Sequence, residues 1–122
     1  MRELTEHKVN PANDQLQVLV VDEPGAGGAH HVYHVVFNPD GANGFLIPIP
    51  FQNGPIAEVG VNGLTHETLL AILADRLRSF QAGPYACKAN ACALTHIEEA
   101  QHWLQQRTLE RVRRGVEGTH GL

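Results

Sequence analysis

The sequence predicts an α+β protein in which a small antiparallel sheet is followed by a long hairpin of two helices. Runs rich in branched residues, separated by turn residues, fill the first half of the chain over about residues 16–61. Apolar residues then recur every three or four positions over about residues 65–114, as in amphipathic helices. A Gly-Pro pair at 83–84 divides that half into two helices. Because their connection is very short, the helices should pack as an antiparallel hairpin.

The sheet is expected from four short extended segments that follow a polar, irregular lead-in of fifteen residues. These segments are residues 16–21, 30–37, 45–51 and 56–61. Turn-forming residues separate them. Pro48 and Pro50 lie two apart in the third segment, so one edge of that strand cannot donate hydrogen bonds. The third strand should therefore lie at the margin of the sheet.

The first helix should begin after Thr65, a favourable N-cap residue, with Glu67 adding negative charge to its first turn. Its apolar stripe consists of Leu69, Leu70, Leu73, Leu77 and Phe80. The second helix is expected from about Tyr85 to Arg114, where the chain has neither Gly nor Pro. Steps of three and four along it give one stripe: Asn90, Ala93, Ile97, Ala100, Leu104, Arg107 and Arg111.

The ends of this second stripe are polar, which allows two interpretations. Cations near a helix C-terminus suit the helix dipole and are often simply solvated. Protein interiors accept an amide and two guanidinium groups only with partners, so an anionic, hydrogen-bonding ligand could instead lie where this helix meets another element. Spacing alone favours the first interpretation.

Length and composition are those of a single domain over residues 1–122, with a sheet part (1–62), a helical part (65–115) and a tail (116–122). The net charge of −4 gives no signature of binding to a nucleic-acid polymer. No apolar run approaches a membrane span, and Met1 is followed by polar residues rather than by a secretion leader. A cytoplasmic protein that does not bind membranes is expected.

No catalytic residue, metal site or cofactor is expected from the motifs. Ser79 is the one serine and has no nucleophile motif around it. The histidines do not show a three-ligand metal spacing, and the glycines form neither a P-loop nor a dinucleotide fingerprint. The sequence therefore favours a binding protein over an enzyme.

The polar ends of the second stripe are too far apart to share a small ligand within one chain. Asn90 lies about 25–32 Å from Arg107 and Arg111 at the α-helical rise. Two hairpins packed antiparallel across a two-fold axis would bring the start of one long helix to the end of the other. Phe80, Asn90 and the arginines could then stack a base, bind its edge or sugar, and hold phosphates.

Three segments together resemble a known family. They are FQNGPIAEVGVNG at residues 51–63, LLAILADRLRSFQAG at residues 69–83, and WLQQRT at residues 103–108 followed by RGVEGT at residues 114–119. This combination resembles the phage anti-Thoeris signal sponges, whose helical hairpin is shared with the phage anti-CBASS sponges. The resemblance covers about residues 30–120.

The resemblance implies a non-catalytic α+β protein, without a cofactor, that assembles as dimers or hexamers in the host bacterial cytoplasm. Members of the family sequester cyclic ADP-ribose isomers such as glycocyclic ADP-ribose, which bacterial TIR-domain immune proteins make. Some members also hold cyclic di- or trinucleotides at separate sites that depend on N-terminal residues. This chain has no Arg between Glu3 and Asp75, which disfavours an arginine-dependent nucleotide site in the sheet.

Position by position, the resemblance implies a ligand site of four residues. Phe80 matches the aromatic that stacks on adenine, Asn90 matches the polar contact, and Arg107 and Arg111 match the guanidinium groups that hold the ligand. Arg111 lies one turn further out than Arg107 and is expected to matter less, with more salt dependence. The alternative is an oligomeric scaffold whose C-terminal arginine cluster contacts an acidic partner.

Overall fold

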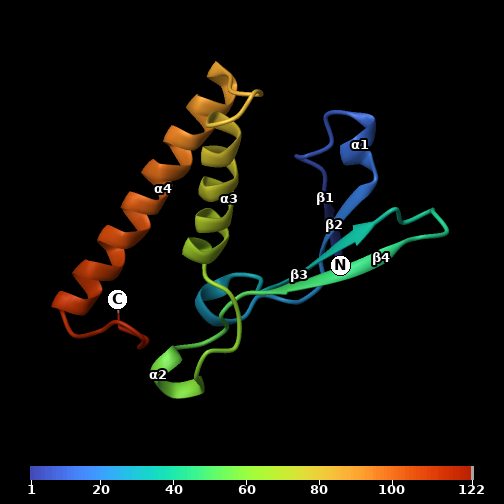
Figure 1. The fold of residues 1–122 in the computed structure, drawn as a ribbon. Helices are drawn as coiled ribbons and strands as arrows, with labels where there is room; N and C mark the ends of the chain where they lie inside the picture. Colours follow the sequence, from blue (N-terminus) through green and yellow to red (C-terminus); the bar gives the residue numbers. More distant parts are fainter. Residues whose placement is uncertain (122) are drawn as a thin grey trace. The chain divides into compact units, whose positions relative to one another are not determined.

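The computed structural model describes residues 1–121 and divides the chain into two compact units, Met1–Gly63 and Leu64–Leu122 (Figure 1). The first unit contains a four-stranded antiparallel sheet and the second a hairpin of two long helices. The predicted α+β class is therefore confirmed. The boundary falls where strand signals give way to helix signals in the sequence, while a single domain over 1–122 stays a prediction.

The sheet contains β1 (Arg2–Leu4), β2 (Leu16–Val20), β3 (Val32–Phe37) and β4 (Phe45–Pro50), paired antiparallel in chain order. β4 lies at an edge, as its prolines predict. The amide of Phe51, directly after β4, donates to the carbonyl of His31 at 2.6 Å. Successive backbone nitrogens point to opposite sides of a strand. The backbone nitrogens of Leu46, Pro48 and Pro50 therefore point away from β3. Two of these three positions have no N–H, which hinders the addition of another strand.

The expectation of an irregular N-terminus was wrong. β1 pairs with β2 through Arg2 opposite Val20, and a short helix, α1 (Pro11–Asp14), follows it. The side chain of Asn10 caps this helix by accepting from the amide of Asn13 at 2.8 Å, and Pro11 occupies its first turn. A short strand that extends an existing sheet needs no apolar alternation of its own, so composition did not reveal β1.

The strand expected at residues 56–61 was also wrong, because these residues form a single helical turn, α2 (Ile56–Val59). The carbonyl of Pro55 accepts from the amides of Glu58 and Val59 at 3.0 and 2.9 Å. Gly60 then ends the turn with a φ of 75°, a conformation that glycine adopts freely. A Pro before the run and a Gly only five residues later outweigh its content of branched residues.

Two side-chain amides hold the loop around α2 closed. Gln52 donates to the carbonyls of Gly54 and Gly60 at 3.1 and 2.8 Å and accepts from the amide of Asn62 at 2.9 Å. Asn62 in turn accepts from the amide of Asn53 at 2.8 Å and donates to the Asn53 carbonyl at 2.7 Å. The first motif of the sequence therefore has a structural role, because its amides replace the backbone pairing that a strand would have made.

A second loop in the sheet unit connects β2 and β3 and includes a 3₁₀ turn, η1 (Ala26–Gly28). One carboxylate oxygen of Asp22 accepts from the amide of His31 at 2.9 Å. The other is buried and, among the described residues, has no hydrogen-bond partner, although Nδ1 of His30 lies 3.8 Å from it. Nδ1 of His30 instead donates to the Asp22 carbonyl at 2.7 Å. The hydrogen bond from the His31 amide holds the pKa of Asp22 below its ordinary value, although burial opposes this shift.

The hairpin contains α3 (His66–Gln81) and α4 (Lys88–Arg113). Thr65 caps α3 as predicted, in a reciprocal capping box with Thr68. α4 begins three residues later than expected. The Gln81 side chain bonds both the amide and the carbonyl of Cys87 at 3.1 Å, which holds residues 82–87 as a turn. Cys87 then caps α4, its sulfur accepting from the amide of Asn90 at 3.4 Å.

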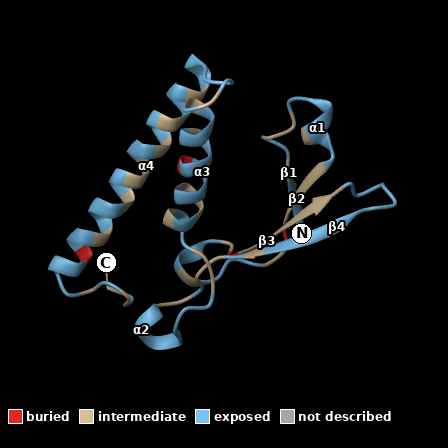
Figure 2. Ribbon diagram, in the orientation of Figure 1, coloured by how far each residue is buried: buried red, intermediate tan, exposed pale blue. Residues whose placement is uncertain are grey.

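The face of α4 that is removed from solvent differs slightly from the predicted stripe (Figure 2). The part-buried or buried residues of α4 are Asn90, Leu94, Ile97, Ala100, Gln101, Leu104, Thr108 and Arg111. Ala93 and Arg107, which the predicted stripe included, are exposed. Five of the seven predicted positions therefore lie on the observed face, which also includes Leu94, Gln101 and Thr108.

Much apolar surface of the hairpin remains exposed. Ala74 is its one buried hydrophobic residue among those described, and Leu73 and Phe80 of the predicted apolar stripe are exposed. Ile72 on α3 and Trp103 on α4 are 63% and 67% exposed. Apolar surface of this extent is typical of a protein-interaction face. Within residues 1–121, no helix combines the length and apolar character that a membrane span requires.

Candidate functional site

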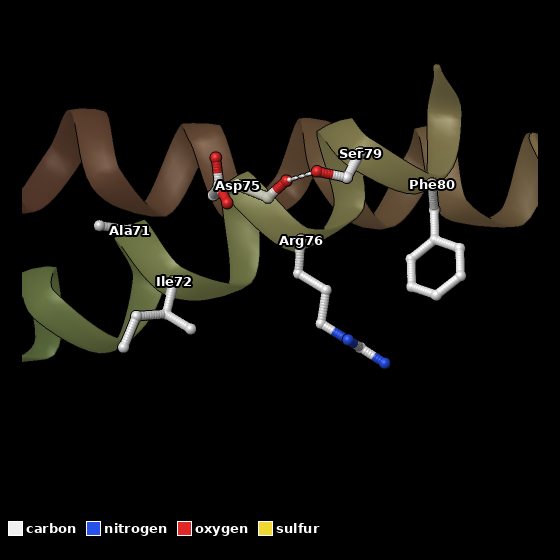
Figure 3. A pocket seen from close by; sticks show the side chains of 6 residues that line it. All are labelled: Ala71, Ile72, Asp75, Arg76, Ser79 and Phe80. Atoms are coloured by element: carbon white, nitrogen blue, oxygen red, sulfur yellow. Dashed lines mark hydrogen bonds between the residues drawn. The ribbon is translucent and has the colours of Figure 1, made fainter. Parts of the chain in front are cut away.

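Phe80 lies in the last turn of α3 and is the first of the four predicted ligand residues. Phe80 is 36% exposed, and the guanidinium carbon of Arg76 lies 5.0 Å from its ring centroid. Arg76, Ile72 and Phe80 follow each other at intervals of four residues and project to the same side of the helix (Figure 3). They line an open depression together with Ala71, Asp75 and Ser79. An accessible aromatic ring beside a cation can stack a base and attract an anion.

Asn90 lies in the first turn of α4, at the same end of the hairpin as Phe80 (Figure 1). Its backbone amide is engaged by Cys87, and its side chain is part-buried. The Gln81–Cys87 hydrogen bonds fix the turn from which Asn90 emerges. The connection between the helices therefore holds the start of α4, which carries Asn90, next to the end of α3, which carries Phe80.

Arg107 lies on the last third of α4, on the flank of the helix rather than on its inner face. Its side chain is exposed, and it has no hydrogen-bond or ion-pair partner within the part of the chain that the structure describes. Arg107 is thus available to an anionic ligand. Its guanidinium group is not engaged by the hairpin itself.

Arg111 differs from Arg107, although it lies only one turn further along α4. It is 9% exposed and therefore more buried than Arg107, contrary to the expectation that it lies further out. Its guanidinium donates to the carbonyls of Val116, Thr119 and Gly121 at 2.9, 3.1 and 2.5 Å. Its Nε lies 3.3 Å from a carboxylate oxygen of Glu117. We call residues 116–121 the C-terminal tail, and this tail surrounds the Arg111 guanidinium.

The end of α3, which carries Phe80, and the start of α4, which carries Asn90, lie at one end of the hairpin (Figure 1). Arg107 and Arg111 lie near the other end of α4. Seventeen residues separate Asn90 from Arg107 on one continuous helix, which is about 25 Å at the α-helical rise. The four predicted ligand residues therefore form two groups at opposite ends of one hairpin, which we call half-sites. The first offers a ring and an amide, and the second offers positive charge.

Sequence reasoning missed two features of these half-sites. Arg76 beside Phe80 could have been found, because residues four apart on a helix are neighbours. The capture of Arg111 by the tail could not, because it depends on how residues 116–121 fold back. Among residues 1–121, no group of three or more His, Cys, Asp or Glu side chains is placed to hold a metal ion.

Comparison with known proteins identifies the hairpin. The sequence model described as "Acb2/Tad1, hairpin domain" matches residues 47–109, which is more than half of the chain. The matched segment contains α3 and most of α4, including Phe80, Asn90 and Arg107. It ends before Arg111 and the tail.

A curated relative gives the same result. "Thoeris anti-defense 1" of Bacillus phage SBSphiJ7 is 49% identical over 77 residues, which are 63% of this chain. The match covers 54% of that relative, so the chain spans about half the length of the protein it resembles. Since the family model matches more than half of the sequence and describes the hairpin seen in the structure, the chain belongs to the Acb2/Tad1 hairpin family.

Proposed function

We propose that this protein is a non-catalytic sponge that binds a cyclic ADP-ribose isomer and removes it from Thoeris signalling. The observation that carries the proposal is the family match over residues 47–109, which includes Phe80, Asn90 and Arg107. The name of the phage relative, Thoeris anti-defense 1, agrees with it. A sponge acts stoichiometrically, so it needs tight binding and no reaction.

The chemistry of the half-sites fits such a ligand. Phe80 offers an accessible ring face for adenine, and Asn90 offers both a donor and an acceptor for a base edge or a ribose hydroxyl. Arg107 offers an exposed guanidinium that can grip a pyrophosphate with two parallel hydrogen bonds. Each group matches one chemical part of the ligand.

The complete site requires two chains. In a two-fold dimer of antiparallel hairpins, Phe80 and Asn90 of one protomer would meet Arg107 of the partner, and symmetry would create two identical sites. The exposed apolar side chains of Ile72, Leu73 and Trp103 favour such a contact, because surface of this kind rarely remains open to water. A dimer, or a hexamer built as a trimer of dimers, is therefore the proposed assembly.

Thermal unfolding with a panel of ligands tests the function. A ligand present at 100 times its dissociation constant should stabilise the protein by about 2.7 kcal/mol. The panel contains the cyclic ADP-ribose isomers, linear ADP-ribose, and one cyclic dinucleotide and one cyclic trinucleotide for a second class of site. Stabilisation by a cyclic isomer supports the sponge, whereas no shift with any member would favour the oligomeric scaffold.

Chemical recovery of the ligand tests the absence of catalysis. After binding and heat denaturation of the protein, the cyclic isomer should be recovered unchanged by chromatography. Formation of linear ADP-ribose in excess of the protein concentration would show turnover and would place the protein among enzymes.

A further inference from the structure

The connection between α3 and α4, residues 82–87, has few contacts of its own. Between the hydrogen bonds that end α3 and those that begin α4, its described backbone makes one hydrogen bond, from the amide of Ala86 to the carbonyl of Gly83 at 3.4 Å. Pro84 has no N–H to donate, and Tyr85 is 75% exposed. The geometry of the connection therefore depends on a contact from a neighbouring helix.

Gln81, the last residue of α3, supplies that contact. Its Nε2 donates to the carbonyl of Cys87 and its Oε1 accepts from the amide of Cys87, both at 3.1 Å. One side chain thus satisfies both backbone groups of the residue that caps α4. We call these two hydrogen bonds the Gln81 clasp. Because Phe80 directly precedes Gln81, the predicted stacking ring and the clasp come from the same turn of α3.

The start of α4 has little other local stabilisation. Its cap is the sulfur of Cys87, which accepts from the amide of Asn90 at 3.4 Å, and sulfur is a weaker acceptor than the oxygen side chains that usually cap helices. Lys88 puts a positive charge in the first turn, where the helix dipole disfavours it, and this turn contains no acidic residue. Asn90 therefore lies in a turn that depends on the clasp.

We propose that Gln81 is a positioning residue for ligand binding: its clasp on Cys87 holds the first turn of α4, and with it Asn90, at the end of α3 that carries Phe80. The proposal rests on the proposed function for its ligand. A turn that is already ordered loses less conformational entropy on binding, which is how preorganisation raises affinity. Opening the clasp should therefore weaken binding through the position of Asn90.

Replacement of the Gln81 amide tests this role first. Gln81→Met keeps the length of the side chain but loses both hydrogen bonds, and it should weaken binding of the cyclic ADP-ribose isomer by on the order of tenfold. Gln105→Met, at an exposed position of α4, is the matched control and should bind as the parent does. Circular dichroism and light scattering compare the folding and assembly of the variants. Parental affinity in Gln81→Met would overturn the proposal.

Two double-mutant cycles separate positioning from a general loss of stability. If Gln81 acts through Asn90, adding Gln81→Met to Asn90→Ala should cost little further affinity. Adding it to Arg107→Ala should multiply the two losses, because Arg107 lies at the far end of α4. Multiplication of the losses in both cycles would show that Gln81 acts independently of Asn90, and this would overturn the proposal.

A stronger cap should compensate for an open clasp. Cys87→Ser places a hydroxyl, a preferred capping group, at the start of α4. In the Gln81→Met background this substitution should recover part of the lost affinity and of any lost helical content. Absence of any recovery would contradict a role that acts through the start of α4.

Hydrogen exchange without ligand, measured by NMR, tests the clasp itself. In Gln81→Met the amides of Cys87 and Asn90 should exchange faster than in the parent, while those in the middle of α3 and α4 stay protected. Unchanged exchange at both amides would overturn the clasp. If the parent binds no cyclic ADP-ribose isomer, the proposed function fails and the ligand role of Gln81 fails with it. If the parent binds and Gln81→Met binds equally, only the role of Gln81 fails.

Discussion

Arg107 and Arg111 lie one turn apart on α4, yet their guanidinium groups have different surroundings. Arg107 faces solvent, whereas Arg111 is buried among tail carbonyls and one carboxylate. A buried guanidinium is costly unless its N–H groups are hydrogen-bonded and its charge is paired. The contacts of Arg111 with the tail therefore have a structural role in the free protein. Arg107 has no such task among the described residues, and it is the position at which a substitution should affect ligand binding most directly.

We expect the substitution of each predicted contact residue by alanine to weaken ligand binding for a different physical reason. Arg107→Ala should cost about 2–5 kcal/mol, because a desolvated phosphate would lose its guanidinium. Asn90→Ala should cost about 1–3 kcal/mol through an unpaired ligand group, and Phe80→Ala about 1–3 kcal/mol through lost stacking. Calorimetry on folded, correctly assembled variants measures these losses. Arg107→Ala with parental affinity would place the site elsewhere.

Asp22 gives a pH-dependent prediction within the sheet unit. Its folded pKa lies below the ordinary 3.8 because the His31 amide donates to its carboxylate. A carboxylate with a lowered pKa stabilises the fold above its unfolded pKa, and this contribution is lost as the pH falls through the lower folded value. Asp22→Asn should therefore lower the melting temperature at pH 7, and the difference from the parent should shrink below pH 3.8. Asp40→Asn, at an exposed loop position, is the control for the removal of one carboxylate charge.

At the scale of elements, the sequence predicted best where local signals and packing agree. Thr65 and Gly83 predicted the start and the end of α3, which the structure places at His66–Gln81. Pro48 and Pro50 predicted that β4 lies at the edge of the sheet, as the structure shows. Residues 56–61 were predicted as a strand because their composition is strand-like. Their conformation depends instead on Pro55, on Gly60 and on the hydrogen bonds of Gln52 across the turn, which composition does not reveal. The same limit applies to the tail around Arg111.

Gly63 gives a sharp test of the loop that these amides close. A Cβ on Gly63 would lie 2.3 Å from the carbonyl carbon of Phe51 and 2.6 Å from the amide nitrogen of Gln52, both backbone atoms. Gly63→Ala must therefore move the backbone, and we expect a loss of about 1–3 kcal/mol or more in the free energy of unfolding.

Gly83→Ala is the matched control for this substitution. A Cβ there would meet its nearest atoms at 3.5 and 3.7 Å, which is ordinary contact. Its effect should stay within about 0.5 kcal/mol. Equal stability of the two variants in denaturant titrations would show that the 51–63 loop yields easily to an added methyl group.

At the scale of the whole molecule, the half-sites and the exposed apolar residues point to the same requirement. The hairpin holds its ring and amide at one end and its cations at the other, about 25 Å away at the α-helical rise. It also leaves Ile72 and Trp103 more than half exposed. A second copy in antiparallel orientation would cover apolar surface and complete the ligand site in one step. Light scattering should therefore find a dimer or hexamer at micromolar concentration, and a stable folded monomer would contradict the shared site.

Mixing two inactive variants tests the shared site directly. A Phe80→Ala/Asn90→Ala double variant lacks one half-site, and Arg107→Ala lacks the other, so neither should bind ligand well alone. In a dimer that contains one chain of each kind, one site receives both defects and the other receives none. Co-expression at equal levels should therefore restore about a quarter of the parental sites at parental affinity, measured by calorimetric stoichiometry. If each chain binds its ligand alone, every site keeps one defect and no tight sites return.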